Sequence, residues 1–273
     1  MNLIKKSLNL MLSAGMLFSV ANAQAVLNMV GSTTVLPIAQ LAAEVYMEKN
    51  DSLKISVGGG GSGVGVAAIM NGRTDIGMAS RPAQTKEIVT AKANGINLFE
   101  NAVAVDAITI VVHPEVGALV KNLTIAQIRD IYTGKISSWA EVGGPKKPIV
   151  VVSRDVSSGT FEVFKEKVLG GGKVKNDALM LASNKAVATA VGTTPFSIGY
   201  VGLAFLSPEI AAVTVDSVES NEENARSGKY KISRKLYMYT NGKPKGKIKD
   251  FLDFLLSAEG QALVVKTGYI AVK

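Results

Sequence analysis

The 273-residue sequence contains no cysteine, one histidine and one tryptophan. The lack of cysteine excludes disulfide bridges, thiol nucleophiles and a lipobox cysteine that could carry a lipid anchor. The single histidine, His113, has no cysteine or carboxylate at ligand spacing, so the sequence indicates neither a metal site nor a cofactor. The folded chain must therefore be stabilised by packing and hydrogen bonding without covalent or metal crosslinks.

Long hydrophobic runs are also missing, except for one segment near the N-terminus. Lys5 and Lys6 precede an apolar run over residues 8–20, and the tripeptide Ala-Asn-Ala that ends at Ala23 fits the small-x-small cleavage rule. The run is too short for a comfortable membrane span. We interpret residues 1–23 as a secretory signal peptide cleaved after Ala23, which predicts an exported, periplasmic protein.

The remaining composition is that of a globular protein, with 47% hydrophobic and 19% charged residues. The formal net charge is +8, and lysines are densest at residues 243–249. These lysines have no aromatic residues between them, so they make a poor nucleic-acid site and are more typical of a solvated surface. A mild positive field would still attract an anionic ligand.

Strand and helix patterns alternate along the chain, which predicts an α/β architecture with mainly parallel sheets. β-branched runs predict strands, and apolar residues three or four positions apart predict helices. The expected strands are residues 26–30, 53–57, 75–79, 103–112, 149–152, 198–201, 212–215 and 235–239. The expected helices are residues 34–49, 64–71, 85–94, 124–132, 158–168, 183–191, 248–256 and 258–266.

The most informative motif is Ser-Arg-Asp-Val-Ser-Ser-Gly-Thr-Phe at residues 153–161. A strand delivers Arg154 into a turn where Ser158 and Thr160 supply hydroxyls, and Gly159 lets backbone N–H groups approach a ligand closely. The following helix points its free N–H groups at the same place. No base lies nearby to activate a serine, so the motif is suited to holding an oxyanion. The alternative is an ordinary serine-rich helix cap with a surface arginine.

Two further strand-to-helix turns have the same design. Residues 31–34 read Gly-Ser-Thr-Thr, with two threonines placed to cap a helix, and residues 58–63 form a glycine run that contains Ser62. The run formally matches the dinucleotide fingerprint, but four consecutive glycines satisfy that spacing by accident. Because ligands collect outside the carboxyl ends of strands in open α/β sheets, we expect the three turns to converge on one anion.

The ordered set of motifs resembles the substrate-binding proteins of phosphate ABC transporters, the PstS family. The resemblance spans nearly the whole mature chain, and the combination is more specific than any single piece. It implies a two-lobed periplasmic-binding-protein fold of the second type, with phosphate bound in a cleft between lobes joined by two crossing strands. The motifs are residues 30–37, 60–65, 75–81, 131–136 with Trp139, 154–160 and 198–202.

The resemblance also implies which residues contact phosphate. One departure concerns Arg81, which follows Ser80 where well-known members place an aspartate that accepts the phosphate proton. Asp106 is our candidate for that acceptor, and its alternative role is pairing with backbone or with Arg81. A carboxylate beside Arg81 and Arg154 should stay ionised. The implied phosphate contacts are Thr33, the Thr34 backbone, Ser62, Arg154, Ser158, Gly159 and Thr160, with Ser80, Arg81 and Asp106 as further candidates.

We expect lobe one to combine residues 24–110 with 236–273 and lobe two to contain residues 111–235. The expected function is high-affinity phosphate binding and delivery by hinge closure to the permease and ATPase subunits of an ABC importer, with the protein a monomer. One alternative is a binder of sulfate, molybdate or tungstate. The other is an exported phosphatase, which would need metal ligands or a base that the sequence does not supply, so we expect no enzyme.

Overall fold

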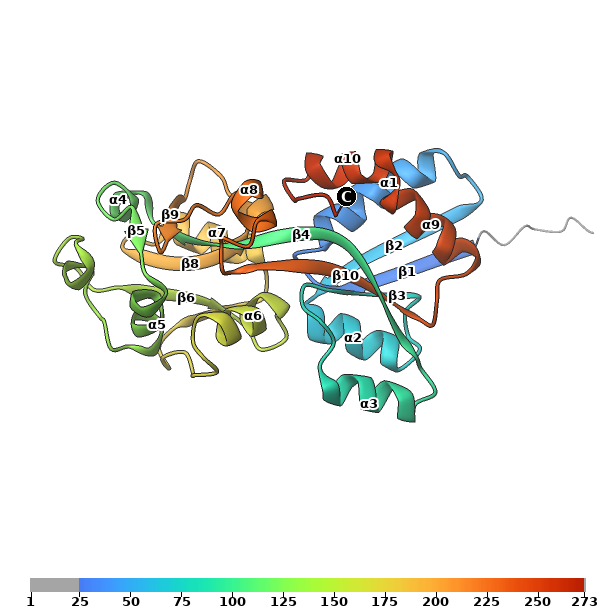
Figure 1. Cartoon of the computed structure of the whole chain (residues 1–273), viewed down its shortest axis with the longest axis horizontal. Helices are drawn as coiled ribbons and strands as arrows, with labels where there is room; N and C mark the ends of the chain where they lie inside the picture. The colour runs from blue at the N-terminus through green and yellow to red at the C-terminus, as the bar shows by residue number, and fades with distance from the viewer. Residues whose placement is uncertain (1–24, 273) are drawn as a thin grey trace, which may run out of the picture.

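The computed structural model describes residues 25–272, so the predicted signal peptide lies outside the described residues. Two α/β bodies, lobe one and lobe two, are connected by the long strands β4 (Leu98–Val112) and β10 (Ser233–Asn241) (Figure 1). Within the described range, no helix combines the length and apolar character needed to cross a membrane. The two-lobed fold that the sequence predicts is therefore confirmed.

Lobe one is a sheet in the order β2–β1–β3–β10–β4 with helices on both faces (Figure 1). The first three strands run parallel to one another, and β10 runs antiparallel to β3 and β4. Helices α1, α9 and α10 cover one face, and α2 and α3 cover the other. The bounds are β1 (Ala25–Gly31), α1 (Leu36–Glu48), β2 (Leu53–Gly60), α2 (Ser62–Met70), β3 (Ile76–Ala79), α3 (Thr85–Ala93), α9 (Gly246–Leu256) and α10 (Ala258–Lys266).

Lobe two continues the sheet in the order β4–β8–β6–β7, with β9 pairing β4 and β5 pairing β9. Strand β6 is parallel to its neighbours β7 and β8, whereas β4 is antiparallel to β8 and β9. The bounds are α4 (Pro114–Gly117), β5 (Asn122–Leu123), α5 (Ile125–Thr133), η1 (Trp139–Val142), β6 (Val150–Arg154), α6 (Gly159–Lys167), β7 (Leu179–Leu181), α7 (Asn184–Thr193), β8 (Ser197–Gly202), η2 (Leu203–Phe205), β9 (Ala211–Val215) and α8 (Glu222–Arg226).

The hydrophobic core divides between the lobes. The largest buried cluster draws its members from residues 107–232 and from Ile270, and it includes the fully buried Trp139. A second cluster draws its members from residues 27–104 and 236–269. Strand β4 pairs with β10 up to Ala107 and with β8 from Ile108 onward, so the chain passes between the lobes there. The exact lobe boundaries remain a prediction that this division supports.

Every strand and helix expected from the sequence is present, and two local expectations need correction. The sheet is mixed, because β4 and β10 pass between the lobes in opposite directions. The threonines after β1 do not cap α1, because Ser32 Oγ accepts the N–H groups of Thr34 and Val35 at 3.1 and 3.3 Å.

Candidate functional site

The N-terminal ends of four helices meet where lobe one contacts lobe two. Thr34, just before α1, lies with its Oγ1 3.1 Å from the Oγ1 of Thr160 at the start of α6. Asn184, the first residue of α7, donates its Nδ2–H to Thr34 Oγ1 at 2.9 Å. Gly159 of α6 packs against Ser62, the first residue of α2. All five residues are buried. Their contacts bring the hydroxyl-bearing turns together, as the sequence predicted.

Arg234 at the start of β10 lies in the centre of this group and was not expected from the sequence. Its Nη2 donates to Thr160 Oγ1 at 2.9 Å and to Thr34 Oγ1 at 3.4 Å, and its Nη1 donates to Ser80 Oγ at 3.3 Å. Its side chain is 3% exposed. Arg234 therefore connects hydroxyls from both lobes through a single guanidinium group.

Arg154, the last residue of β6, is the second buried arginine of the site. Its Nε donates to Leu181 O at 3.0 Å, and its Nη2 donates to Ala182 O at 2.9 Å and to Thr33 Oγ1 at 3.3 Å. Its Nη1 is buried and has no hydrogen-bond partner among the described residues. The pKa of Arg154 is lowered to about 10, mainly by burial and also by the charge of Arg234, although Asp155 and Tyr200 raise it. The site therefore holds a cation with an unused donor.

Asp106 on β4 is fully buried and makes an ion pair with Arg234, and not with Arg81, the alternative partner that the sequence offered. Its Oδ2 accepts from Arg234 Nε at 3.1 Å and Nη2 at 2.9 Å, and its Oδ1 accepts from Leu203 N at 3.0 Å. Burial raises the pKa of Asp106, although the Arg234 charge and the Leu203 N–H lower it. Both carboxylate oxygens are engaged, so Asp106 orients Arg234.

The two serines of lobe one form a buried pair beside Arg234. Ser62 Oγ accepts from Ser80 N at 2.9 Å and lies 3.2 Å from Ser80 Oγ. On the opposite side, Ser158 is the N-cap of α6, and its Oγ accepts from Phe161 N at 3.2 Å. The side chains that the sequence singled out are thus assembled from both lobes around Arg154 and Arg234.

Arg81 is the one predicted site residue that the structure does not bring into this group. Its Nη1 and Nη2 donate to the Glu87 carboxylate at 2.7 and 2.8 Å, its Nη1 also donates to Pro82 O at 2.9 Å, and its Nε pairs with Glu162. Burial alone would lower the pKa of Arg81, but the Glu87 hydrogen bond and the two carboxylate charges raise it overall. The guanidinium is held by two carboxylates and by the Pro82 carbonyl, which keeps it away from the hydroxyl cluster.

Sequence reasoning missed Arg234 and Asn184. Arg234 shares a strand face with Leu236 and Met238, both fully buried, because side chains alternate along a strand. An arginine on an apolar strand face is an available signal for a buried functional cation. Asn184 follows the α7 cap Ser183 and offers no comparable signal, because its partner Thr34 lies 150 residues away in the sequence.

The glycine run packs against Ser157 of lobe two. Gly63 N donates to Ser157 O at 2.9 Å, and Ser157 Oγ donates to Gly60 O at 3.0 Å. Gly61 has φ 96°, and a Cβ built on it would lie 2.7 Å from Ser157 O. The turn therefore needs glycine for close approach between the lobes, and Ser157 occupies the space in front of it.

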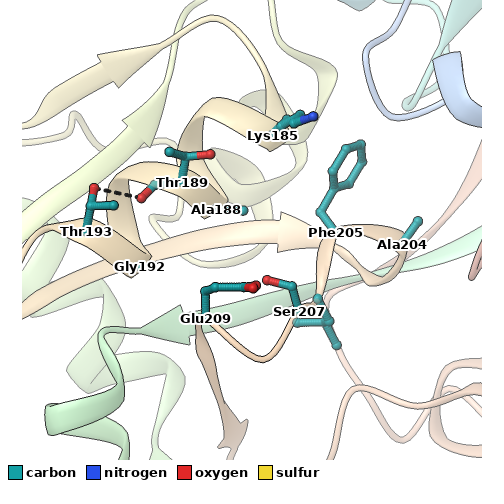
Figure 2. A pocket seen from close by; sticks show the side chains of 10 residues that line it. Lys185, Ala188, Thr189, Gly192, Thr193, Ala204, Phe205, Ser207 and Glu209 are labelled. Carbon is teal, nitrogen blue, oxygen red and sulfur yellow. Dashed lines mark hydrogen bonds between the residues drawn. The ribbon is translucent and has the colours of Figure 1, made fainter.

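A separate pocket of about 440 Å³ lies in lobe two between α7 and η2 (Figure 2). Lys185, Thr189, Phe205 and Glu209 are among the residues that line it, and none of the predicted site residues does. In the described part of the chain, no group of three or more histidine, cysteine or acidic side chains could hold a metal ion. The chemistry-bearing cluster is therefore at the contact between the lobes.

Two lobes joined by strands, with a buried polar site between them, define the class of periplasmic substrate-binding proteins. A sequence profile described as a PBP superfamily domain matches residues 19–259. The phosphate-binding protein PstS of Bacillus subtilis is 34% identical over 244 residues, covering 89% of this chain and 79% of the relative. The PstS of Borreliella burgdorferi is 31% identical and covers 96% of both chains. The chain belongs to the PstS family.

Solved structures agree with this assignment. A Clostridium perfringens protein, described as a phosphate ABC transporter substrate-binding protein with bound phosphate, superposes with a TM-score of 0.83 at 36% identity and covers 91% of this chain and all of its own. A Vibrio cholerae protein described as an ABC-type phosphate transport receptor gives a TM-score of 0.74 at 29% identity, with 89% of this chain and 99% of its own covered. Both similarities extend over the two lobes.

Proposed function

We propose that this protein binds inorganic phosphate between its lobes and delivers it to an ABC-type importer. The observation that carries the proposal is the excess of buried positive charge. Arg154 and Arg234 lie within the site, Asp106 neutralises one of them, and Arg154 Nη1 has no hydrogen-bond partner among residues 25–272. Because an uncompensated buried charge is unfavourable, a bound anion would stabilise the site by neutralising the excess positive charge.

The donors around the two arginines suit a tetrahedral oxyanion. Serine and threonine hydroxyls both donate and accept, so they can also accept the proton of hydrogen phosphate, which sulfate lacks. Asp106 is engaged with Arg234 and Leu203, which makes a hydroxyl the favoured acceptor for that proton. We assign phosphate contacts to Thr33, Thr34, Ser62, Ser80, Arg154, Ser158, Gly159 and Thr160, and we add Arg234 to them.

Delivery follows from the two-lobed arrangement. The assigned contacts come from both lobes, so phosphate binding favours the closed form, and closure is the signal that a membrane permease can read. We propose an exported monomer, cleaved after Ala23, that works in the periplasm with permease and ATPase subunits. We propose a binding role without catalysis, in keeping with relatives that are named phosphate-binding proteins.

Calorimetric titration of phosphate-stripped protein with phosphate, sulfate, molybdate and tungstate tests this function. We expect phosphate to bind most tightly and a chromogenic phosphate ester to remain unhydrolysed. Tighter binding of another anion would identify that anion as the ligand instead of phosphate. Hydrolysis of the ester would show that the protein is an enzyme and contradict the binding function.

A further inference from the structure

A second polar contact between the lobes lies apart from the anion site. Glu162 on α6 of lobe two reaches Arg81 and Gln84, which lie between β3 and α3 of lobe one. Glu162 Oε2 accepts from Gln84 Nε2 at 2.6 Å and pairs with Arg81 Nε. The side chains of Arg81 and Glu162 are 5% and 23% exposed. The same residues line a groove of about 890 Å³ between the lobes, so the contact lies at the edge of their interface.

The lobe-one side of this contact is held in place without help from lobe two. Glu87 binds the Arg81 guanidinium through two parallel hydrogen bonds, and its Oε2 also accepts Gln84 N at 2.7 Å. This second interaction belongs to the capping box of α3. A bidentate carboxylate pair fixes the guanidinium plane, and Arg81 Nε makes an ion pair, without a hydrogen bond, with Glu162.

The lobe-two side is rigidly linked to the anion site. Glu162 lies two residues after Thr160 on α6, and its neighbours Val163 and Phe164 pack in the core of lobe two. On the other side, Ala83 packs against a different cluster in lobe one. The contact therefore joins elements of two separate cores, and it forms when the lobes approach each other.

We propose that Glu162, Arg81 and Gln84 form a latch that keeps the lobes closed over phosphate, with Glu162 setting the rate of release. The latch rests on the proposed phosphate-binding function. None of its side-chain contacts involves an assigned phosphate contact, so it acts after the anion has entered. Glu162 is ion-paired with Arg81 and hydrogen-bonded to Gln84, and truncating one member of such a charge pair acts mainly on dissociation. Because Glu162 is partly exposed, we expect an increase in dissociation rate of about tenfold in Glu162→Ala.

The matched control is Glu166→Ala, which removes the same charge from the same helix at an exposed position that lines the same groove but lacks the contacts of Glu162 with Arg81 and Gln84. Because the sequence lacks cysteine, Val156→Cys gives a single attachment point for a fluorophore on an exposed residue near the lobe contact. Stopped-flow fluorescence of the labelled proteins then gives phosphate association and dissociation rates.

We expect Glu162→Ala to dissociate phosphate faster, with an association rate within about twofold of the parent and an unchanged melting temperature without ligand. Glu166→Ala should match the parent, and Glu162→Gln, which keeps the side-chain volume, should lie between them. A parental dissociation rate in Glu162→Ala overturns the latch, as does a loss of stability without ligand that accounts for the whole effect. If the parent itself binds no phosphate, the proposed function fails instead.

Discussion

Gly159→Ala adds one methyl group where the two lobes pack tightly against each other. Gly159 begins α6 in lobe two, and a Cβ there would lie 2.3 Å from Ser62 Oγ and 2.8 Å from Ser80 Oγ, both in lobe one. Ordinary contact begins at about 3.4 Å, so the closed arrangement would have to open by about 1 Å. The methyl group has no such clash once the lobes separate, so the substitution acts on closure.

The expected magnitude follows from overpacking, which costs about 1–3 kcal/mol when a well-packed interior receives an extra methyl group. The clash destabilises only the closed form, because the clashing atoms belong to the opposite lobe. Phosphate affinity should therefore fall by about 5-fold to 150-fold. The residue 159 N–H is retained, so the loss cannot be attributed to a missing hydrogen-bond donor.

Isothermal titration calorimetry of Gly159→Ala with phosphate measures this loss, and calorimetric unfolding without ligand should give a melting temperature close to that of the parent. Gly58→Ala is the matched control, because a Cβ on Gly58 would meet its nearest atom, Val30 Cγ2, at an ordinary 3.5 Å within lobe one. Parental affinity in Gly159→Ala would refute the close approach of α6 to Ser62 in the ligand-bound form.

Three further predictions concern the charges of the site and its closure. Arg154→Met should cost phosphate about 2–5 kcal/mol of binding free energy by calorimetry, with little change in ligand-free stability, because the repulsion with Arg234 disappears; unchanged affinity removes Arg154 from the site. Asp106→Asn leaves Arg234 buried without its counter-charge and should destabilise the ligand-free protein by about 3–5 kcal/mol in denaturant unfolding. Saturating phosphate should recover part of that loss, and equal losses with and without phosphate contradict the charge argument. Small-angle scattering should show a smaller radius of gyration with phosphate, and an unchanged radius means that the lobes do not close on binding.

The sequence alone determined the local units of this protein. The motif at residues 153–161 predicts a strand, a turn and a helix, because a β-branched run, hydroxyl residues, a glycine and a helical pattern follow one another within a few positions. The structure places these residues on β6 and α6 as expected. The turns at Thr34 and Ser62 could be predicted for the same reason. The order of such units also carried the family resemblance, and with it the two-lobed fold.

Only the tertiary structure decided which charges meet. Arg234 and Asp106 are 128 residues apart, and they pair because antiparallel β4 and β10 place them opposite each other. Arg81 is next to Ser80 in the sequence, yet it turns to Glu87 and Glu162 because a bidentate carboxylate lies in the first turn of α3 and another lies across the lobe contact. Side-chain partners in a buried site depend on strand register and on how two lobes approach, and neither is a local property of the chain.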